Sequence, residues 1–293
     1  MLHVDNVSKS FEDRSVLNNL NLDVEQGTIF ALVGVNGAGK TTLLRTVAGI
    51  YKPDSGLVTF DDMNVYYDEM ARRDIFLVSD DPYYPFAENM NSLKHFYKAF
   101  YNFDESLYNE YLVTFGLNEK QPISSFSKGM KRQAMLVFAL AIKPKLLLLD
   151  EAFDGLDPIV RYELKKVLSD FILDNNSTII ISSHNLKELE DICDEYGILS
   201  GGKITTYGDL IEKKSSINKY QVGFKQEVDH SVFDRFNVLH MNKEGSVYTL
   251  VIKGERDEIE SELNKLNPVI MDVLNVNFEE LFIYEHEEEN NDF

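Results

Sequence analysis

The chain has 293 residues, a net charge of −20 at pH 7 and one cysteine, Cys193. This length accommodates a full α/β domain and a smaller second domain. The negative charge argues against a nucleic-acid groove, which needs clustered lysine and arginine, and against direct adsorption to anionic lipid. One cysteine excludes an internal disulfide, and no apolar run approaches the ~20 residues that a membrane-spanning helix needs. We expect a soluble chain without a signal peptide, whose membrane role, if any, comes through a partner.

A phosphate-binding loop is predicted early in the chain. Residues 34–42 fit the pattern G-x-x-x-x-G-K-[ST], after an apolar strand at 28–33 and before a helix that opens at 42–48. Glycines let backbone N–H groups point at phosphate oxygens, and a helix N-terminus favours negative charge. We expect Lys40 to reach the β- and γ-phosphates and Thr41 to hold Mg²⁺. The alternative is a simple glycine-rich turn.

Residues 81–143 are predicted to form a helical insertion. Two stretches carry apolar and aromatic residues at helical spacing, which indicates two helices with these side chains in a core. They are Leu93, Phe96, Tyr97, Phe100 and Tyr101, and then Leu107, Tyr108, Tyr111, Leu112 and Phe115. Gly116 is expected to end the second helix.

Residues 144–205 return to alternating strands and helices. The run at 146–149 predicts a buried strand, Asp157 and Pro158 begin a helix, and 178–182 predict the next strand. This alternation predicts a mainly parallel sheet covered by helices on both faces.

An acidic pair ends the strand at 146–149, on the sheet edge where ligands bind in open α/β folds. We expect Asp150 to hold Mg²⁺ through its water shell. We expect Glu151 to polarise the attacking water as a general base. The alternative is a pair of carboxylates that caps the following turn.

Beyond residue 213 the pattern changes to an expected β-α-β-β-α-β order, which resembles a ferredoxin-like domain. Strands are expected near 220–224 and 269–276, a hairpin at 242–245, and helices near 231–236, near 257–266 and from 278 onward. The acidic end at 285–292 is expected to be a solvated, frayed tail.

Two further polar positions lie beside predicted elements. Ser127 and Gly129 precede an amphipathic helix and so offer a second anion site at its N-terminus. His184 follows the strand at 178–182. Taken alone, Ser127 is an ordinary N-cap and His184 an ordinary surface histidine.

In this order, the segments resemble the ATP-binding cassette (ABC) ATPase family over roughly residues 1–210. The resemblance implies a RecA-like P-loop core with an antiparallel β subdomain. Residues 1–212 are then the ATPase domain, with 81–143 as its helical subdomain, and 213–293 are an α+β accessory or regulatory domain.

The resemblance also implies residue roles. Residues 127–130 match the signature motif, which contacts the γ-phosphate bound to the other cassette of a head-to-tail dimer, and 154–157 match the dimer-contacting loop. His184 matches the switch histidine, and Phe11 the adenine-stacking aromatic, with core packing as its alternative. The implied nucleotide contacts are Phe11, Val16, Asn36, Gly37, Gly39, Lys40, Thr41, Thr42, Ser127, Gly129 and Asp157. The implied catalytic residues are Glu151 and His184, and the implied metal ligands are Thr41, Asp80 and Asp150.

Three positions depart from the family pattern. Residues 126–130 read F-S-K-G-M, similar to the variant of bacterial drug and peptide exporters. Ala152 and Phe153 replace the usual Pro-Thr, and we expect altered packing only. Asp80 stands where the family carries a glutamine that contacts Mg²⁺ and links the site to the membrane subunit. We expect Asp80 to reach the metal, directly or through water, with altered coupling.

The resemblance implies ATP hydrolysis with Mg²⁺ at a cassette dimer, formed with an identical chain or a close paralogue. The partner would be an integral membrane transporter subunit at the cytoplasmic face of the membrane, with no nucleic acid. Tyr83, Tyr84 and Phe86 are candidates to line the groove for that subunit, with loop packing as the alternative.

The segment at 277–282 resembles the end of the accessory domain in bacterial export-type cassettes. It favours export of a drug or a peptide, such as a phenol-soluble modulin, over import. The alternative is a regulatory or non-transport ABC ATPase that acts as a nucleotide-dependent dimerisation switch.

Overall fold

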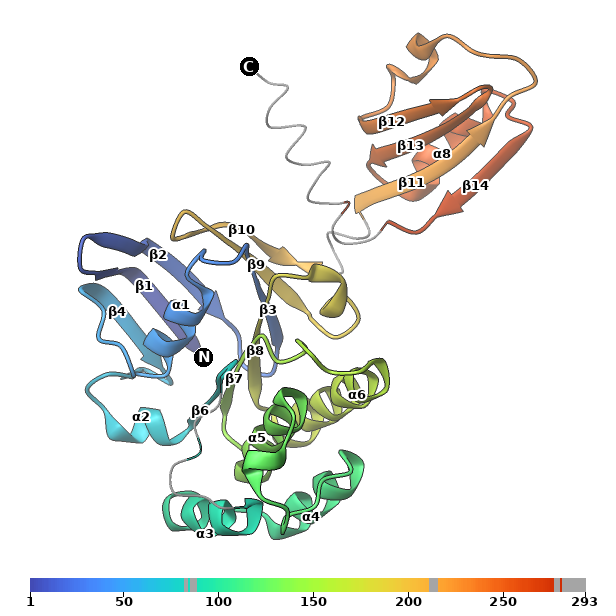
Figure 1. Cartoon of the computed structure of the whole chain (residues 1–293). Helices are drawn as coiled ribbons and strands as arrows, with labels where there is room; N and C mark the ends of the chain where they lie inside the picture. The colour runs from blue at the N-terminus through green and yellow to red at the C-terminus, as the bar shows by residue number, and fades with distance from the viewer. Residues whose placement is uncertain (82–83, 85–88, 211–215, 277–279, 281–293) are drawn as a thin grey trace. The chain divides into compact units, whose positions relative to one another are not determined.

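A computed structural model describes residues 1–81, 84, 89–210, 216–276 and 280 of the chain. The chain separates into two compact units, Met1–Tyr207 and Gly208–Phe293, and each is described here by itself (Figure 1). The domain boundary expected at residues 212 and 213 lies outside the described residues.

The first unit is built on a six-stranded sheet in the order β10-β9-β3-β8-β7-β6. The pairs from β9 to β6 are parallel, as the alternation of strands and helices predicted. The strand bounds are β3 Ile29–Val33, β6 Ile75–Val78, β7 Leu146–Asp150, β8 Thr178–Ser183, β9 Glu195–Ser200 and β10 Lys203–Asp209. Every residue of β3, β7 and β8 is buried, as expected for central strands that are covered on both faces.

A smaller antiparallel sheet shares a core with one face of the large sheet. Its order is β2-β1-β4-β5, with β1 Leu2–Phe11, β2 Arg14–Val24, β4 Ser55–Phe60 and β5 Met63–Asn64. Helix α1 (Lys40–Val47) contributes Leu43, Leu44 and Val47 to this core. The short helix α2 (Glu69–Arg73) follows, with Asp68 as its N-cap. The phosphate loop and α1 are therefore anchored between two sheets.

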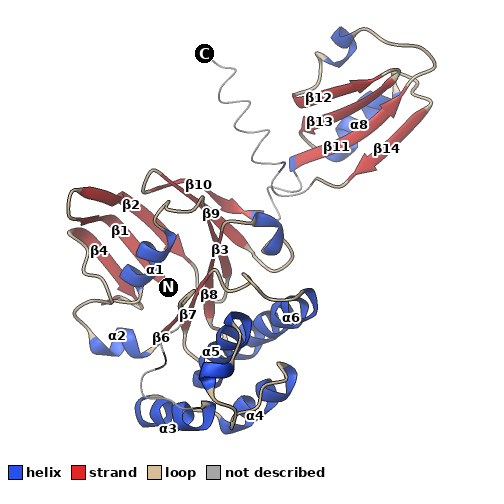
Figure 2. Ribbon diagram, viewed as in Figure 1, coloured by secondary structure: helices blue, strands red, loops and turns tan. Residues whose placement is uncertain are grey.

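Helices α5 (Lys128–Ile142) and α6 (Pro158–Asn175) lie beside the large sheet, away from α1 (Figure 2). Helix α6 begins at the predicted position, because Asp157 accepts hydrogen bonds from two backbone N–H groups and Pro158 occupies the first turn. The short 3₁₀ helix η2 (Leu186–Glu188) follows β8.

The predicted helical insertion contains α3 (Met90–Phe100), α4 (Glu105–Thr114) and the 3₁₀ helix η1 (Ile123–Ser125) ahead of α5. Gly116 follows α4 with a φ of 63°, as its predicted role in ending that helix requires. The prediction of core positions was wrong for Phe96 and Phe100, which are exposed. The core-facing side of α3 is used by Leu93 and Tyr97 instead, while the rings of Phe96 and Phe100 pack on each other at the surface with centroids 5.0 Å apart.

The second unit has a four-stranded sheet in the order β12-β13-β11-β14, with all neighbours antiparallel. Its elements are β11 Ile217–Gly223, η3 His230–Phe233, β12 Val238–Glu244, β13 Val247–Lys253, α8 Arg256–Asn264 and β14 Ile270–Leu274. The helix predicted near 231–236 is wrong, because this segment forms only one 3₁₀ turn. Asp229 caps that turn, and this turn with the bend after it already places Val232, Phe233 and Phe236 against the core of this unit, so no longer helix is needed to bury them.

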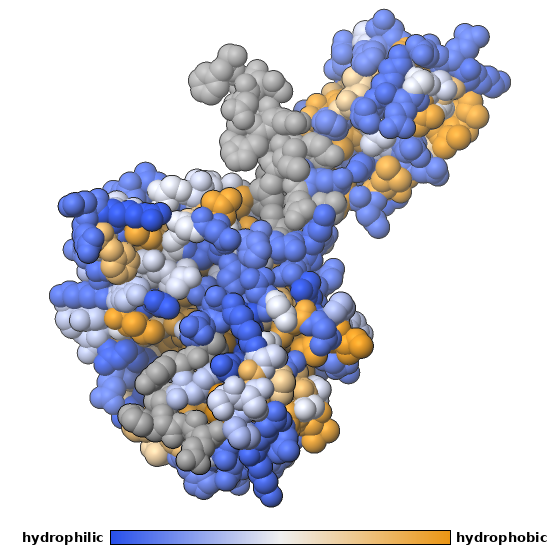
Figure 3. Space-filling model, viewed as in Figure 1, coloured by the Kyte–Doolittle hydropathy of each residue, from blue (hydrophilic) through white to orange (hydrophobic). Residues whose placement is uncertain are grey.

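The helix predicted from residue 278 and the acidic tail at 285–292 lie outside the described residues. Within the described part of the chain, no helix combines the length and the apolar character that crossing a bilayer requires. Hydrophilic residues cover most of the face drawn in Figure 3, in keeping with the net charge of −20.

Candidate nucleotide site

The phosphate loop connects β3 to α1 through a turn that only glycine accommodates. Gly37 and Gly39 have φ values of 82° and 111°, and Gly39 is the N-cap of α1. A Cβ on Gly39 would lie 3.2 Å from the backbone oxygen of Val16. The loop therefore packs directly against β2, with the helix N-terminus behind it.

Lys40 is buried at the base of this loop. Its Nζ donates a hydrogen bond to the Gly34 carbonyl oxygen at 2.6 Å and forms an ion pair with Glu151 Oε1 at 3.1 Å. Only 6% of Lys40 is exposed. A buried ammonium group needs such partners, so the pair fixes both side chains at one point of the cleft.

Asp150 ends β7 and Glu151 follows it directly, and Ser182 on the adjacent strand β8 connects the two residues. The Ser182 hydroxyl donates to Asp150 Oδ1 at 2.7 Å and accepts from the Glu151 backbone N–H at 3.0 Å. Glu151 has a φ of 49°, an uncommon conformation for a residue with a side chain. Sequence reasoning missed Ser182, although its place near the end of a parallel strand was the available signal.

His184 contacts the other oxygen of the same carboxylate. Its Nδ1 lies 2.9 Å from Glu151 Oε2. This hydrogen bond raises the pKa of His184 above its usual 6.5, while partial burial and Lys40 act in the opposite direction. The carboxylate of Glu151 thus lies between Lys40 and His184.

One cleft collects most of the residues that the sequence singled out. It is lined by Arg14, Val16, Asn36, Gly37, Gly39, Lys40, Thr41, Thr42, Asp80 and Glu151. Sequence reasoning missed Arg14, which begins β2 and has its guanidinium 3.9 Å from a Cβ placed on Gly37. Asp150 is buried behind this lining, with 2% of its surface exposed.

Phe11 lies at the end of β1, outside the residues that line the cleft. Its ring is 39% exposed and meets Tyr51 edge-on, with ring centroids 5.2 Å apart. Lys9 Nζ lies 5.4 Å from the same ring centroid. This exposure does not fit a core residue and leaves ring surface available for a base.

Comparison with known proteins decides the family. The ABC transporter family pattern matches residues 17–154. The ABC transporter ATP-binding protein YtrB of Bacillus subtilis (strain 168) is 31% identical over 287 residues, covering 97% of this chain and 97% of that protein. The chain belongs to the ABC transporter ATP-binding proteins.

Other similar proteins agree with this family. The lantibiotic transport ATP-binding protein SrtF of Streptococcus pyogenes is 35% identical over 210 residues, covering 70% of this chain and 89% of that protein. The bacitracin transport ATP-binding protein BcrA of Bacillus licheniformis is 34% identical over 202 residues, covering 68% of this chain and 66% of that protein.

Solved structures show the same fold. The ATP-binding subunit of an ABC transporter gives a TM-score of 0.67 at 27% identity, covering 73% of this chain and 92% of that one. A dimeric ATP-binding cassette bound to ADP and Pi gives a TM-score of 0.64 at 20% identity, covering 72% of this chain and 99% of that one. The protein is an ABC ATPase with an α/β P-loop fold.

Ser127 and Gly129, which were predicted to be signature residues, are not among the residues that line the cleft. Ser127 is the exposed N-cap of α5, and its hydroxyl accepts from the Met130 N–H at 3.1 Å. Gly129 packs closely on the following loop, since a Cβ there would lie 3.1 Å from the Gly155 carbonyl oxygen. Asp157 uses its carboxylate to cap α6.

Asp80 lines the cleft, and its carboxylate is paired on the side of α5. Its Oδ1 lies 3.0 Å from Lys128 Nζ and also contacts the Arg132 guanidinium, a residue that sequence reasoning missed. Thr41, Asp80 and Asp150 offer hydroxyl and carboxylate oxygens, the donor set that suits Mg²⁺. The ABC cassette therefore has suitable residues for the metal of Mg-ATP.

A second group of side chains also approaches a metal-binding arrangement. Glu151, Asp154 and His184 bring one ligand atom each to within 4.8 Å of one another. Lys40 already pairs with Glu151 there. Its positive charge disfavours a resident cation, so we assign no metal to this group.

Tyr84 packs as a loop residue. Its hydroxyl donates to the Lys131 carbonyl of α5, and burial raises its pKa. This contact fits the loop-packing alternative for Tyr84, while Tyr83 and Phe86 lie outside the described residues.

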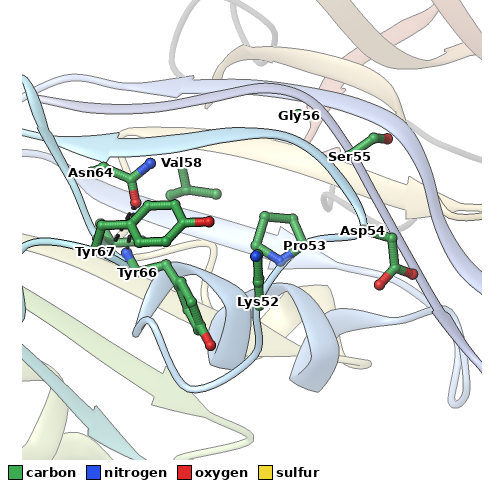
Figure 4. A pocket seen from close by; sticks show the side chains of 10 residues that line it. Lys52, Pro53, Asp54, Ser55, Gly56, Val58, Asn64, Tyr66 and Tyr67 are labelled. Carbon is green, nitrogen blue, oxygen red and sulfur yellow. Dashed lines mark hydrogen bonds between the residues drawn. The ribbon is translucent and has the colours of Figure 1, made fainter.

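The antiparallel β subdomain of the ABC cassette has a small pocket of its own (Figure 4). Lys52 Nζ lies 5.7 Å and 5.4 Å from the ring centroids of Tyr66 and Tyr67, and Asn64 Oδ1 accepts from the backbone N–H of both tyrosines. These contacts satisfy the pocket's polar groups internally, so it adds no ligand to the nucleotide site.

Proposed function

We propose that this chain is the ATP-hydrolysing subunit of an ABC exporter that moves a drug or a peptide through a membrane partner. The observation that carries the proposal is the line of contacts from Lys40 through Glu151 to His184 beside the phosphate loop. In this proposal the contacts join a phosphate-binding cation and a general base that line the cleft to a γ-phosphate sensor beside them. The names of the relatives SrtF and BcrA, which state transport of a lantibiotic and of bacitracin, support export of such cargo.

In this proposal the chain binds ATP with Mg²⁺. The N–H groups of the phosphate loop and Lys40 bind the triphosphate, and Phe11 and Val16 flank the base. Thr41 and Asp150 hold the metal, with Asp80 as a further ligand. The metal neutralises the phosphate charge when bound.

The same contacts support the proposed chemistry. Glu151 orients and deprotonates the attacking water, and Ser182 fixes its backbone. His184, held by Glu151, then lies within reach of the terminal phosphate.

A second cassette is proposed to complete each site. Ser127 is exposed at the N-terminus of α5, outside the cleft of its own chain. This position supports the idea that Ser127 and Gly129 bind the phosphate held by the partner's loop, in a head-to-tail dimer. Asp157 and the loop at 154–157 would lie at that contact. The dimer would sit at the cytoplasmic face of the membrane on its transporter subunit.

The second unit is proposed to be a ferredoxin-like accessory domain over 213–293, with its first helix reduced to η3. The sheet order β12-β13-β11-β14 supports this assignment. We propose that this domain strengthens the dimer by contacting its twin. The end segment at 277–282, which suggested an exporter, lies outside the described residues.

The Glu151→Gln variant tests the function. The protein is isolated with ATP from its own cells in mild detergent, with the Glu151→Gln, Lys40→Ala double variant as the matched control. We expect the single variant to retain ATP in a closed dimer and to bring a multi-helix membrane protein at a fixed ratio. The double variant should bring neither. Recovery of soluble partners alone would favour the regulatory or non-transport ATPase, and undiminished turnover would refute Glu151 as the base.

A further inference from the structure

Arg132 is a fully buried arginine at the start of α5, with none of its surface exposed. One end of its guanidinium, Nη1, donates to the backbone oxygen of Asp154. The other end, Nη2, donates to the backbone oxygen of Asp80 at 3.2 Å and to the Asp80 carboxylate. A single side chain thus joins two loops that border the nucleotide cleft.

Two further contacts hold these segments together. The Tyr84 hydroxyl donates to the Lys131 carbonyl, which fastens the segment after β6 to α5. Gly129 packs on the Gly155 carbonyl, which fastens α5 to the loop after β7. The Asp80 segment, the signature helix and the loop that carries Glu151 therefore meet around Arg132.

The geometry requires arginine. The planar guanidinium presents two donors in a fixed fork, so that one residue serves Asp154 and Asp80 at once. A lysine at the same place retains the charge but makes fewer directed bonds. Lys128 contacts the same Asp80 oxygen at 3.0 Å, but it is 64% exposed, so solvent screens its contribution.

Asp80 is therefore a carboxylate with two competing sets of partners. It lines the nucleotide cleft, and its Oδ1 is already bound by Arg132 and Lys128. Two cations on one oxygen draw electron density from the carboxylate and fix its orientation, so that Asp80 is a weaker metal ligand than an unpaired carboxylate.

We propose that Arg132 is a positioning residue that holds Asp80 against α5 and thereby sets the Mg²⁺ concentration at which this cassette binds ATP. The inference rests on the proposed function, in which Asp80 is a ligand of the metal of Mg-ATP. Through its hydrogen bond to the Asp154 backbone oxygen, the same arginine holds the loop after β7 against α5. The positive charges of Arg132 and Lys128 on Oδ1 oppose a metal bound to the same carboxylate, so a higher Mg²⁺ concentration is needed for Asp80 to take part in binding.

The test measures ATP binding of the full chain by calorimetry over a series of Mg²⁺ concentrations. We expect Arg132→Gln to lower the Mg²⁺ concentration for half-maximal binding by about threefold to tenfold, because Asp80 is released to the metal. Arg132→Lys should give a smaller shift in the same direction. Asp80→Asn should raise this concentration, and adding Arg132→Gln to Asp80→Asn should change it no further.

Arg72→Gln is the matched control. Arg72 is a half-buried arginine that donates to the backbone oxygens of Val65 and Tyr66 and does not line the nucleotide cleft. We expect it to lower the melting temperature without moving the Mg²⁺ dependence. If Arg132→Gln does not fold, the comparison of Arg132→Lys with Asp80→Asn decides the question by the same readout.

Each result has a definite meaning. If Arg132→Gln and Arg132→Lys lower the melting temperature but leave the Mg²⁺ dependence of ATP binding unchanged, the inference is overturned. Arg132 then only stabilises the fold. Additive effects in the double variant overturn it as well, since they show that Arg132 does not act through Asp80. If the unaltered protein binds no ATP, the proposed function fails, and the inference fails with it.

Discussion

Lys40 and Glu151 form an ion pair of 3.1 Å between the phosphate loop and the end of β7. The two residues are more than 100 positions apart in the chain, yet this pair and the His184 contact leave the Glu151 carboxylate between two basic groups. The two groups position each other, which suits the roles proposed for them as phosphate-binding cation and general base.

Replacing Lys40 by alanine should reduce ATP affinity by roughly tenfold to a hundredfold, the range of a hydrogen bond to a charged group. It also leaves the half-buried Glu151 carboxylate without its cation, so the melting temperature should fall. Calorimetric titration with Mg-ATP measures the affinity. Lys98→Ala, which breaks the exposed pair of Lys98 with Glu105, is the control and should leave ATP affinity unchanged. Equal affinities in both variants would contradict the assigned role of Lys40.

The pair of His184 with Glu151 should make stability depend on pH. Because the folded pKa of His184 is raised above 6.5, the protonated form is favoured by folding, and its stabilising effect is fully present below the unfolded pKa. It is lost as the pH rises through the raised folded value. Urea unfolding from about pH 5.5 to about pH 9 measures the free energy of unfolding of both proteins. The unaltered protein should be more stable than His184→Gln at the acidic end, and this difference in free energy should shrink toward alkaline pH. A stability difference that grew with pH would contradict the upward direction of the His184 pKa shift.

Ser182 should support both stability and turnover. Ser182→Ala removes the hydroxyl that links Asp150 to the Glu151 backbone, which should cost about 1–3 kcal/mol of unfolding free energy and lower kcat. Ser177→Ala is a close match, because Ser177 is also buried and donates to the Pro144 carbonyl, at the opposite end of the β8 segment. Both variants should lose stability, but only Ser182→Ala should lose ATPase activity. Equal kcat values in the two variants would rule out a role for Ser182 in placing the base.

The positive φ of Gly39 should make an alanine there costly in two ways. Gly39→Ala forces a side chain into a strained conformation, at about 1–3 kcal/mol, and brings its Cβ within 3.2 Å of Val16. Gly245→Ala separates the backbone strain from the steric contact, since Gly245 also has a positive φ, 64°, but has open space around it. We expect Gly245→Ala to lose about 1–2 kcal/mol of stability and no ATP affinity. Gly39→Ala should lose both, and intact ATP binding would show that the loop adapts.

Phe11 should contribute to nucleotide affinity through its ring alone. Phe11→Tyr should retain ATP binding, whereas Phe11→Leu should weaken it by about threefold to tenfold, the range of one aromatic stacking contact. The Tyr51 edge contact is the only ring partner of Phe11 within the described residues. Equal loss of ATP and of a ribose triphosphate without a base would refute base stacking.

The sequence alone determined the local parts of this protein. The phosphate loop, the strand before it and the helix after it lie in one continuous stretch, residues 28–48, where glycine conformations, helix dipoles and apolar runs dominate. The same holds for the Asp157 cap of α6 and for β7 with its terminal acidic pair. These features required no knowledge of distant contacts.

Tertiary structure alone decided which distant polar groups meet. Arg14 and Arg132 carried no local signal, and Ser182 carried only its place near the end of a strand, because their roles depend on sheet register and on the packing of α5 against two loops. Arg132, one of the two cations paired with the Asp80 carboxylate, lies 52 residues away in the chain. Burial decided the remaining differences between the predicted and the observed structure. A periodic apolar pattern predicts a helix, but it does not state which of its side chains pack against other elements. Phe96 and Phe100 pack on each other at the surface instead of in the core, and one turn at η3 is enough to place its apolar side chains against the core.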